Sequence, residues 1–272
     1  MAFRLFEEKH HASIYQRYRF VPPNTVKELI LQYLDEKKGQ PHVLAVDLGC
    51  GTGQNSRRLA PHFQEVVGID VSESQIEEAR AVPGFSNVIY RVGTAEDLPF
   101  PDNSVDLLTA ASAAHWFNQE GFLKEACRTL KPKGCIALFG YTDQDLELHY
   151  GSCGDRLICI YEQTIKSLSP YVSKRVALAN SKLLDLFDAI PFPDKKRIDC
   201  IPVEEDISVS NVLGFLETFS YYQAYKKAEP EAASALLRDT QAKLLEAMGV
   251  SSPETKMKIR LVYFCVLACK TQ

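Results

Sequence analysis

The feature that most constrains this fold is a repeated order of short apolar segment, turn and amphipathic helix between residues 24 and 140. A first helix is expected from Asn24 to Lys37, because Pro22 and Pro23 precede it and Gly39-Gln40-Pro41 follows it. Apolar segments then predict strands at residues 42–48, 65–70, 87–92, 105–111 and 135–140, with helical segments at 54–62, 74–81 and 119–130. This alternation predicts a doubly wound parallel sheet with helices on both faces.

The pattern changes after Gly140. Residues 143–190 have apolar positions at helical spacing without a strand between them, and residues 210–248 are again helical with a break near Pro230. Strands are expected at 198–202 and 258–270. Extra helices between late strands usually cover the edge where ligands bind, so we expect a cap. The interpretation is a single domain over 1–272, with a lid and helix at 1–40, a ligand-binding core at 41–140, and the cap with the last strands at 141–272.

Composition excludes several other classes of protein. The chain is 46% hydrophobic and 24% charged, as in an ordinary globular domain, and its net charge of -4 argues against a nucleic-acid partner. The eight cysteines are scattered and are interpreted as reduced thiols, with Cys265 and Cys269 in the core rather than in a metal site. Residues 1–11 have no signal-peptide pattern, and the longest apolar stretch, Leu261 to Cys269, is too short to span a membrane. A cytoplasmic protein without metal or membrane partner is expected.

A glycine-rich turn follows the first expected strand directly, with the sequence Asp47-Leu48-Gly49-Cys50-Gly51-Thr52-Gly53. Glycine permits positive φ and lets a ligand approach the backbone closely. The spacing differs from the G-x-G-x-x-G of dinucleotide sites, and no Gly-Lys-Ser/Thr of a P-loop follows. The Asp47 carboxylate suits an ammonium or sulfonium charge, while the next helix N-terminus can receive a carboxylate. Methionine joined to adenosine has these groups; the alternative is a tight turn without a ligand.

Acidic side chains also follow the next two expected strands. Asp70 ends the second strand, where a carboxylate accepts hydrogen bonds from ribose hydroxyls. The alternative for Asp70 is helix N-capping, which Ser72 could supply instead. After the third strand comes Ala95-Glu96-Asp97-Leu98-Pro99-Phe100, in which an acid can accept from an adenine amine while Leu98 or an alanine packs on the ring. The alternative for this segment is an ordinary turn.

These segments resemble the successive motifs of class I S-adenosylmethionine-dependent methyltransferases. The resemblance is carried by residues 47–53, Ile69-Asp70, 95–100 and Cys127-Arg128-Thr129-Leu130-Lys131-Pro132-Lys133-Gly134, and it is strong over 24–140. Ala113-Ala114-His115-Trp116-Phe117 and the start with Tyr15, Tyr18, Arg19 and Pro22 are similar to the small-molecule "type 11" branch and its trans-aconitate methyltransferase-like members.

Membership of that family implies a Rossmann-like, doubly wound seven-stranded sheet with an antiparallel last strand and a helical cap inserted after strand five. It implies S-adenosyl-L-methionine as cofactor. The residues expected to bind the cofactor are Asp47, Gly49, Gly51, Gly53, Asp70, Ala95 and Glu96.

Methyl transfer from a sulfonium is an in-line displacement that depends on alignment and desolvation. A carboxylate acceptor is already ionised and needs no base, whereas a phenol or amine would benefit from one. His115 is the titratable candidate for that base. The alternative for His115 is a contact residue of the cofactor or the substrate, with no proton role.

Further candidates are expected to contact the acceptor. Tyr15, Tyr18 and Arg19 lie in the expected lid, where Arg19 could hold a carboxylate in a bidentate pair. Trp116 and, in the cap, Tyr222 complete the candidate set, although aromatic residues at helical spacing are more often core. Arg128 should face away from the site and be structural or solvated.

The sequence thus predicts S-adenosylmethionine-dependent methyl transfer to a small molecule, with a carboxylate oxygen as the first acceptor to test, by a monomer or homodimer. A rival hypothesis is a cofactor-binding partner or regulatory protein without catalysis. An open pocket under the cap would favour the enzyme, and side chains filling that volume would favour the binder. Methylation of RNA or protein is disfavoured, because the sequence has no basic stripe and no Asn-Pro-Pro-Tyr-like segment after the fourth strand.

Overall fold

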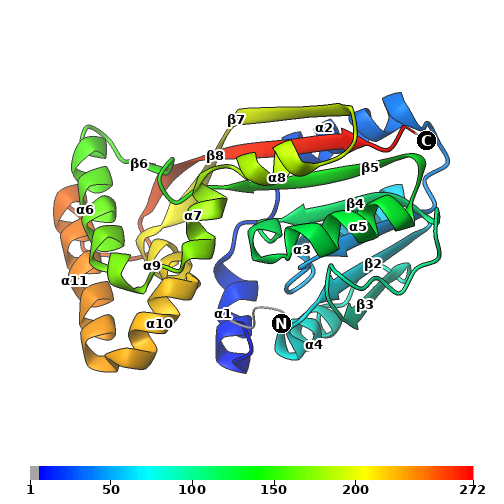
Figure 1. Cartoon of the computed structure of the whole chain (residues 1–272). Coiled ribbons are helices and arrows are strands. Elements are labelled where there is room, and N and C mark those ends of the chain that lie inside the picture. The colour runs from blue at the N-terminus through cyan, green and yellow to red at the C-terminus, as the bar shows by residue number, and fades with distance from the viewer. Residues whose placement is uncertain (1–5, 272) are drawn as a thin grey trace.

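The computed structural model describes residues 6–271, and one mixed sheet forms its centre (Figure 1). Within these residues the sheet has eight strands: β1 (Leu44–Leu48), β2 (Glu65–Asp70), β3 (Val88–Val92), β4 (Val105–Ala111), β5 (Leu130–Tyr141), β6 (Glu147–His149), β7 (Asp194–Ser208) and β8 (Lys256–Cys269). Their order is β3-β2-β1-β4-β5-β8-β6, and β7 pairs with β8 outside this path. β1 to β5 are parallel, whereas β8 is antiparallel to β5, β6 and β7. The predicted doubly wound fold with an antiparallel last strand is confirmed.

The helices form a core set and a cap set. The α-helices are α1 (Lys9–Tyr18), α2 (Asn24–Lys37), α3 (Gln54–Leu59), α4 (Glu73–Ala81), α5 (Gln119–Thr129), α6 (Gly154–Ser167), α7 (Lys174–Asn180), α8 (Leu184–Ala189), α9 (Val209–Glu217), α10 (Ser220–Ala228) and α11 (Pro230–Met248). Short 3-10 turns lie at Ala60–His62 (η1), Ala114–Trp116 (η2) and Ser169–Tyr171 (η3). In Figure 1, α6, α9, α10 and α11 lie together at one end of the sheet. Helix α1 contacts both α4 and α9, so it joins the core to this cap.

Alternation along the strands builds a hydrophobic core on each face of the sheet. In β1, Ala45 belongs to one buried cluster and Val46 to the other, because successive side chains point to opposite faces. Helix α2 covers the first cluster, while Phe122 of α5 covers the second. Strand β1 lies between β2 and β4, so the strand order reverses there. This reversal makes the carboxyl ends of β1 and β4 the expected ligand site.

The structure differs from the sequence-based expectation in the second half of the chain. The prediction of an all-helical segment over 143–190 was wrong, because β6 pairs there with Lys258–Arg260 of β8 and gives the sheet an eighth strand. Three residues are too few for a recognisable strand pattern. Strand β7 is also longer than the predicted 198–202. The prediction missed its ends because they are partly exposed and carry charged rather than apolar residues. The predicted helical stretch 210–248 divides into α9, α10 and α11.

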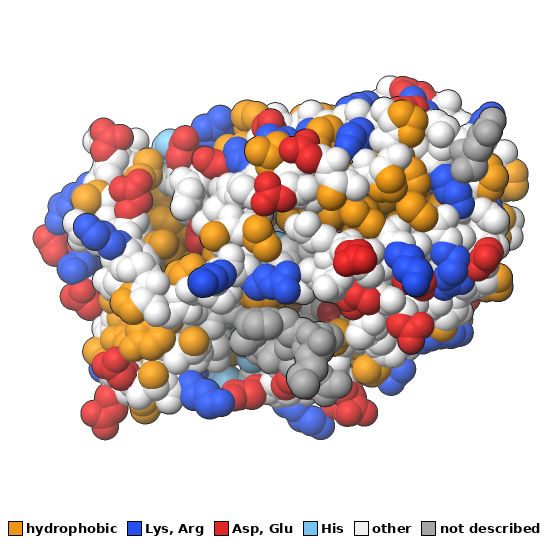
Figure 2. Space-filling model, in the orientation of Figure 1, with side chains coloured by type: hydrophobic (Ala, Val, Ile, Leu, Met, Phe, Trp, Pro, Cys, Tyr) orange, Lys and Arg blue, Asp and Glu red, His pale blue; other side chains and the backbone are white. Residues whose placement is uncertain are grey.

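The surface of the described residues is mixed in charge. On the face drawn in Figure 2, Lys and Arg side chains alternate with Asp and Glu side chains rather than forming a continuous stripe. No helix among the described residues is both long and apolar enough to cross a membrane. Within residues 6–271, no three His, Cys, Asp or Glu side chains form a group suited to a metal ion. All eight cysteines are free, and Cys265 and Cys269 are buried in the core.

Candidate active site

A cavity enclosing about 790 Å³ of space open to solvent lies at the point where the strand order reverses. We call it the main cavity. The sequence-predicted residues that line it are Tyr15, Gly49, Gly51, Asp70, Ala95, Glu96 and Trp116. They come from α1, from the turn after β1, from the end of β2 and from the segments after β3 and β4. The fold therefore brings most of the predicted cofactor-binding residues to one place.

The glycine turn has the backbone conformation that only glycine adopts easily. Gly49, Gly51 and Gly53 have φ of 61°, 54° and 82°. A Cβ on Gly49 would lie 2.5 Å from the Cβ of Ala113, so the turn packs directly on the segment after β4. Gly53 lies on the other side of the turn, where an added Cβ would overlap the side chain of Tyr90. Gly53 lines neither the main cavity nor the second cavity described below, so its expected ligand contact is not supported by its position.

Asp47 lies beneath the turn and is fully buried. Its Oδ1 accepts a hydrogen bond from Asn55 Nδ2 (2.8 Å), and its Oδ2 accepts one from Ser56 Oγ (2.6 Å). Burial raises the pKa of Asp47 to about 6, although these two hydrogen bonds lower it. Both oxygens are thus engaged by α3, and the carboxylate anchors that helix under the glycine turn. Asp47 also lines the second cavity described below.

Asp70 connects the glycine turn to α4. Its Oδ2 accepts a hydrogen bond from Gly51 N and its Oδ1 accepts one from Ser72 N, both at 2.9 Å. Ser72 itself caps α4 by accepting from Gln75 N, so Asp70 is not the cap of this helix. Burial raises the pKa of Asp70, whereas the backbone hydrogen bonds lower it. A carboxylate offers about four acceptor positions, so Asp70 keeps acceptor capacity at the main cavity.

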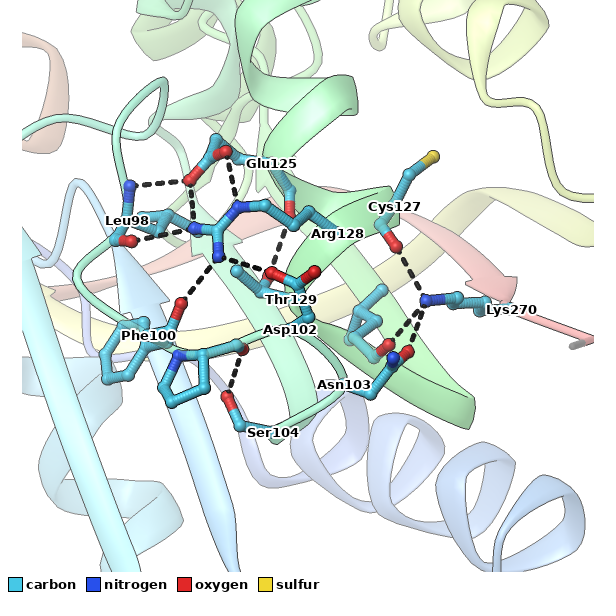
Figure 3. A network of polar contacts seen from close by, with 12 residues as sticks. Leu98, Phe100, Asp102, Asn103, Ser104, Glu125, Cys127, Arg128, Thr129 and Lys270 are labelled. Atoms are coloured by element: carbon cyan, nitrogen blue, oxygen red, sulfur yellow. Dashed lines mark hydrogen bonds and ion pairs between the residues drawn. The ribbon is translucent and has the colours of Figure 1, made fainter.

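The segment after β3 is held in place by an ion-paired network shown in Figure 3. Arg128 of α5 donates to the carbonyl oxygens of Leu98 (2.9 Å) and Phe100 (2.7 Å). Its Nη2 also pairs with Glu125 Oε2 (2.6 Å), which in turn accepts from Leu98 N (2.8 Å). Arg128 is therefore structural, which is one of the two roles expected from the sequence. It fixes the segment that places Ala95 and Glu96 at the cavity.

Aromatic side chains of the N-terminal segment cover the main cavity. The ring of Phe6 lies 5.8 Å from that of Tyr15 and 6.3 Å from that of Trp116. Ser72 Oγ donates to the Phe6 carbonyl oxygen (2.6 Å), which ties this segment to the start of α4. Buried His11 lies 3.0 Å from the Thr218 carbonyl oxygen and ties α1 to the cap. The expected lid is therefore a covering segment, of which residues 1–5 lie outside the described part.

A second cavity of about 500 Å³ borders the glycine turn on the side of the cap. It shares Tyr15, Gly49 and Gly51 with the main cavity, so the two spaces meet at the turn. Arg19 lines it and donates from Nη1 to Tyr141 Oη (2.8 Å). Such open volume beyond the turn is the feature expected of an enzyme rather than of a non-catalytic binder.

Arg19 remains a charged group despite its burial. Burial lowers the pKa of Arg19, but the hydroxyl groups of Tyr141 and Tyr15 raise it by more, so that the net shift is upward. The guanidinium carbon also lies 5.0 to 5.3 Å from the ring centres of Tyr15, Phe215 and Phe219. Within residues 6–271 no carboxylate forms an ion pair with Arg19, and its Nε has no hydrogen-bond partner.

His115 lies in η2 beside Trp116, with the ring centres 4.7 Å apart, and it lines neither cavity. Burial lowers the pKa of His115 to about 3, with further lowering by the positive charges of Arg19 and Arg175. The imidazole is therefore neutral at pH 7. A proton acceptor that binds protons so weakly is a poor general base. Because His115 lines neither cavity, its position does not support a contact with cofactor or substrate either.

Two of the predicted acceptor contacts lie away from both cavities. Tyr222 is fully buried in the cap core, where its hydroxyl donates to the Ala233 carbonyl oxygen (3.1 Å). Its position corrects the acceptor assignment, because helical spacing placed this ring on the inner face of α10. Tyr18 packs over Gly214 of α9 and under Arg17, so it too is a packing residue.

Two residues that the sequence did not suggest do line the cavities. Gln75 lines the main cavity, and its buried Oε1 has no hydrogen-bond partner. Tyr141 lines the second cavity at the carboxyl end of β5. The rule that ligands bind beyond the carboxyl ends of parallel strands could have identified Tyr141. Gln75 follows Asp70 in the first turn of α4 and had no comparable signal.

Comparison with known proteins agrees with this geometry. Residues 46–138 match the methyltransferase domain family of type 11. A Dictyostelium discoideum protein named as a methyltransferase is 27% identical over 254 residues, 89% of this chain and 86% of that protein. The O-methyltransferase resE of Aspergillus sclerotiorum is 39% identical over 111 residues, 39% of this chain and 41% of that one.

Solved structures agree on the fold. A type II methyltransferase structure from Anaeromyxobacter dehalogenans has a TM-score of 0.69 at 24% identity and covers 99% of both chains. The Haemonchus contortus phosphoethanolamine N-methyltransferase 2, in complex with S-adenosylhomocysteine, has a TM-score of 0.51 at 18% identity, covering 97% of this chain and 58% of that one. Residues 46–138 thus match a methyltransferase domain, and the glycine turn and the shared class I fold agree with an S-adenosylmethionine-dependent methyltransferase.

Proposed function

We propose that the enzyme transfers a methyl group to a carboxylate oxygen of a small molecule bound in the second cavity. The observation that carries this proposal is Arg19, a partly buried cation whose Nε is buried without a partner and which has no carboxylate partner within residues 6–271. A buried charge is costly unless it is paired, and a guanidinium matches a carboxylate in a bidentate geometry. An anionic acceptor would supply the missing partner.

The titratable groups at the second cavity support the same acceptor class, because the one carboxylate among its lining residues, Asp47, already accepts hydrogen bonds from α3 with both oxygens. Burial raises the pKa of Tyr141 and of Tyr263, so both hydroxyls stay protonated at pH 7. His115 binds protons too weakly to act as an effective base. A carboxylate is ionised at pH 7 and requires no proton removal, whereas a phenol or an ammonium group would.

The residues of the main cavity fit S-adenosylmethionine. Asp70 keeps acceptor capacity suited to ribose hydroxyls, and Gln75 Oε1 is a buried acceptor that lacks a partner. We propose that Ala95 and Glu96 border the adenine and that Gly49 and Gly51 form the cradle for the methionine part. The bound cofactor supplies a methyl group activated on a sulfonium. This chain's residues orient it and exclude water.

Replacing Asp70 with asparagine is expected to weaken S-adenosylhomocysteine binding about 10- to 100-fold. The reason is that hydrogen bonds to a charged acceptor contribute about 1.5–3 kcal/mol, while the amide keeps the shape of the carboxylate. Isothermal titration measures the affinity. Asp97→Asn is the matched control, because exposed Asp97 lies in the next segment but does not line the main cavity. Unchanged affinity for the Asp70 variant would refute the ribose assignment.

Replacing Arg128 with methionine is expected to release the 98–100 segment and thereby weaken recognition of adenine. Two of its bonds hold the carbonyl oxygens of Leu98 and Phe100, and each bond from a charged donor is worth about 1.5–3 kcal/mol. We expect S-adenosylhomocysteine affinity to fall about 10-fold. Its preference over S-inosylhomocysteine, which lacks the adenine amine, should fall as well.

The control for Arg128 is Lys270→Met. Lys270 Nζ also donates to backbone carbonyl oxygens near α5, those of Cys127 and Leu130, but it does not contact the 98–100 segment (Figure 3). If the Arg128 variant lost affinity equally for S-adenosylhomocysteine and S-inosylhomocysteine, this residue would support the fold without positioning the adenine.

The acceptor class is tested by incubating the purified enzyme with methyl-labelled cofactor and a fractionated metabolite extract. We expect labelled products whose label is released as methanol by mild alkali, which is the behaviour of methyl esters. Alkali-stable label would instead indicate an amine, phenol or carbon acceptor. A cytoplasmic location and a monomer or homodimer remain predictions from the sequence.

A further inference from the structure

A group of buried and partly buried polar side chains extends from the second cavity, between the end of β5 and the cap. We call Arg19, Tyr141, Asp143, Tyr161 and Tyr221 the cap cluster. Arg19 and Tyr141 line the second cavity itself, and Asp143 follows Tyr141 two residues later in the chain. Tyr161 comes from α6 and Tyr221 from α10. The cluster therefore joins the core to two helices of the cap.

Contacts link the two ends of the cap cluster. Arg19 lies 5.0 Å from the ring centre of Phe219, whose ring lies 5.0 Å from that of Tyr221. The Tyr221 hydroxyl donates to Asp143 Oδ2 (2.9 Å). Tyr161 and Tyr221 belong to the same buried cluster, and Tyr141 packs against it. Burial and the charge of Asp143 raise the pKa of Tyr161, so its hydroxyl is protonated at pH 7.

Three polar atoms of this cluster are buried without a hydrogen-bond partner: Arg19 Nε, Asp143 Oδ1 and Tyr161 Oη. Tyr161 is only 3% exposed. Native proteins satisfy nearly all buried polar groups, and those that remain call for an explanation such as a ligand or a water molecule. Of the three residues, Arg19 lines the second cavity, as does its partner Tyr141, and Asp143 and Tyr161 lie outside its lining. A polar molecule that extends from this cavity into the cap cluster would satisfy all three atoms.

The chemistry of the three atoms specifies what would satisfy them. Arg19 Nε is a donor on a cation and suits a carboxylate. Asp143 Oδ1 is an acceptor on an anion and suits a hydroxyl or ammonium group, while the Tyr161 hydroxyl can both donate and accept. A simple aliphatic acid would satisfy Arg19 but would leave Asp143 and Tyr161 unpaired.

We propose that the cap cluster recognises a second polar group of the methyl acceptor, a hydroxyl or an ammonium, through Asp143 and Tyr161. The acceptors are then hydroxy acids or amino acids rather than unsubstituted carboxylic acids. This inference rests on the proposed carboxylate methylation, and it adds residues that select the acceptor. A site that leaves buried polar groups unpaired rejects an analogue lacking the matching group strongly.

The test measures methyl ester formation on acids that differ by one polar group: succinate and malate, glutarate and 2-hydroxyglutarate, 4-methylpentanoate and leucine. We expect the wild-type enzyme to prefer the hydroxyl- or ammonium-bearing member of at least one pair by about 10- to 100-fold in kcat/KM. Asp143→Asn and Tyr161→Phe should each reduce this preference at least about fivefold, mainly through KM. S-adenosylhomocysteine affinity should not change in either variant.

The thermal stability of the variants separates a role in acceptor recognition from a structural role. Removing a buried hydroxyl that has no partner should leave the thermal midpoint of the Tyr161→Phe protein unchanged or raise it. The matched controls are Tyr171→Phe, whose hydroxyl donates to Glu229 at the surface, and Asp155→Asn, which is exposed on α6. Neither control should alter the acceptor preference.

Two results overturn the inference in distinguishable ways. Esters formed at equal rates within every pair, or a preference that survives in both variants, would show that the cap cluster holds only water while carboxylate methylation stands. No ester from any of these acids would overturn carboxylate methylation by this enzyme, and the inference with it.

Discussion

Gly51→Val is expected to lower the affinity for S-adenosylmethionine by at least about 100-fold. Gly51 has a φ of 54°, which a β-branched residue adopts only at a cost of about 1–3 kcal/mol. Its Cβ would lie 3.5 Å from Gln75 Oε1 and 3.7 Å from the ring of Tyr15, so the two methyl groups of valine would extend into the main cavity. Backbone strain and lost volume act together. Isothermal titration with S-adenosylhomocysteine measures the effect.

Gly39→Val is the matched control for backbone strain. Gly39 has a similar φ of 71°, but no atom lies within 4 Å of the position of an added Cβ. This variant should lose thermal stability by about 1–3 kcal/mol and keep its cofactor affinity. If both variants folded and Gly51→Val kept its cofactor affinity, the glycine turn would have only a structural role and would not bind the cofactor.

Arg19→Met is expected to lower kcat/KM for a carboxylate acceptor by about 10²- to 10³-fold, whereas His115→Asn should keep most of the activity. Loss of a bidentate, buried charge pair removes both orientation and affinity, and a misplaced acceptor alone can cost about 10²-fold. Methionine preserves the packing on Phe215 and Phe219. His115 is neutral and lines neither cavity, so a carboxylate acceptor does not need it.

The controls separate charge from folding and from cofactor binding. Arg17→Met changes an exposed arginine of the same helix and should have little effect. Cofactor affinity is also measured in the Arg19 variant. Unchanged affinity means that Arg19 binds the acceptor, and reduced affinity means that it binds the methionine carboxylate of the cofactor. The opposite pattern, an inactive His115→Asn enzyme beside a fully active Arg19→Met enzyme, would overturn the proposed mechanism.

The pH dependence gives a second measurement. The lowered pKa of His115, about 3, means that its protonation cannot produce a rising limb of activity near pH 6.5. A carboxylate acceptor with a pKa near 4 also stays ionised above pH 6. Asp47 has a pKa of about 6 and is ionised above pH 7, so we expect kcat/KM to be flat between about pH 7 and 8. A rising limb in that range would indicate an acceptor that must lose a proton.

Local patterns explain why the first half of the fold could be predicted. Strands β1 and β4 are buried on both faces, so each is mostly apolar, with Asp47 in β1 and Asp106 and Thr109 in β4 as the polar exceptions. Short-range rules also located the glycine turn and Asp70, because a ligand site at the carboxyl ends of parallel strands follows from chain order alone. Strand β6 and the ends of β7 escaped these rules, since their place depends on pairing with β8, which is more than 45 residues away along the chain.

The sequence by itself determined the βα order, the glycine turn and the acids at the strand ends, because each depends on residues that are near one another in the chain. Tertiary structure alone decided which distant side chains meet beside the second cavity. Tyr222 and Tyr221 are neighbours in the chain, yet one lies in the cap core and the other reaches Asp143. Arg19 likewise meets Tyr141 across 122 positions, which no local pattern encodes. The proposed acceptor site is made by such long-range packing, because residues far apart in the chain meet there only when the cap has folded.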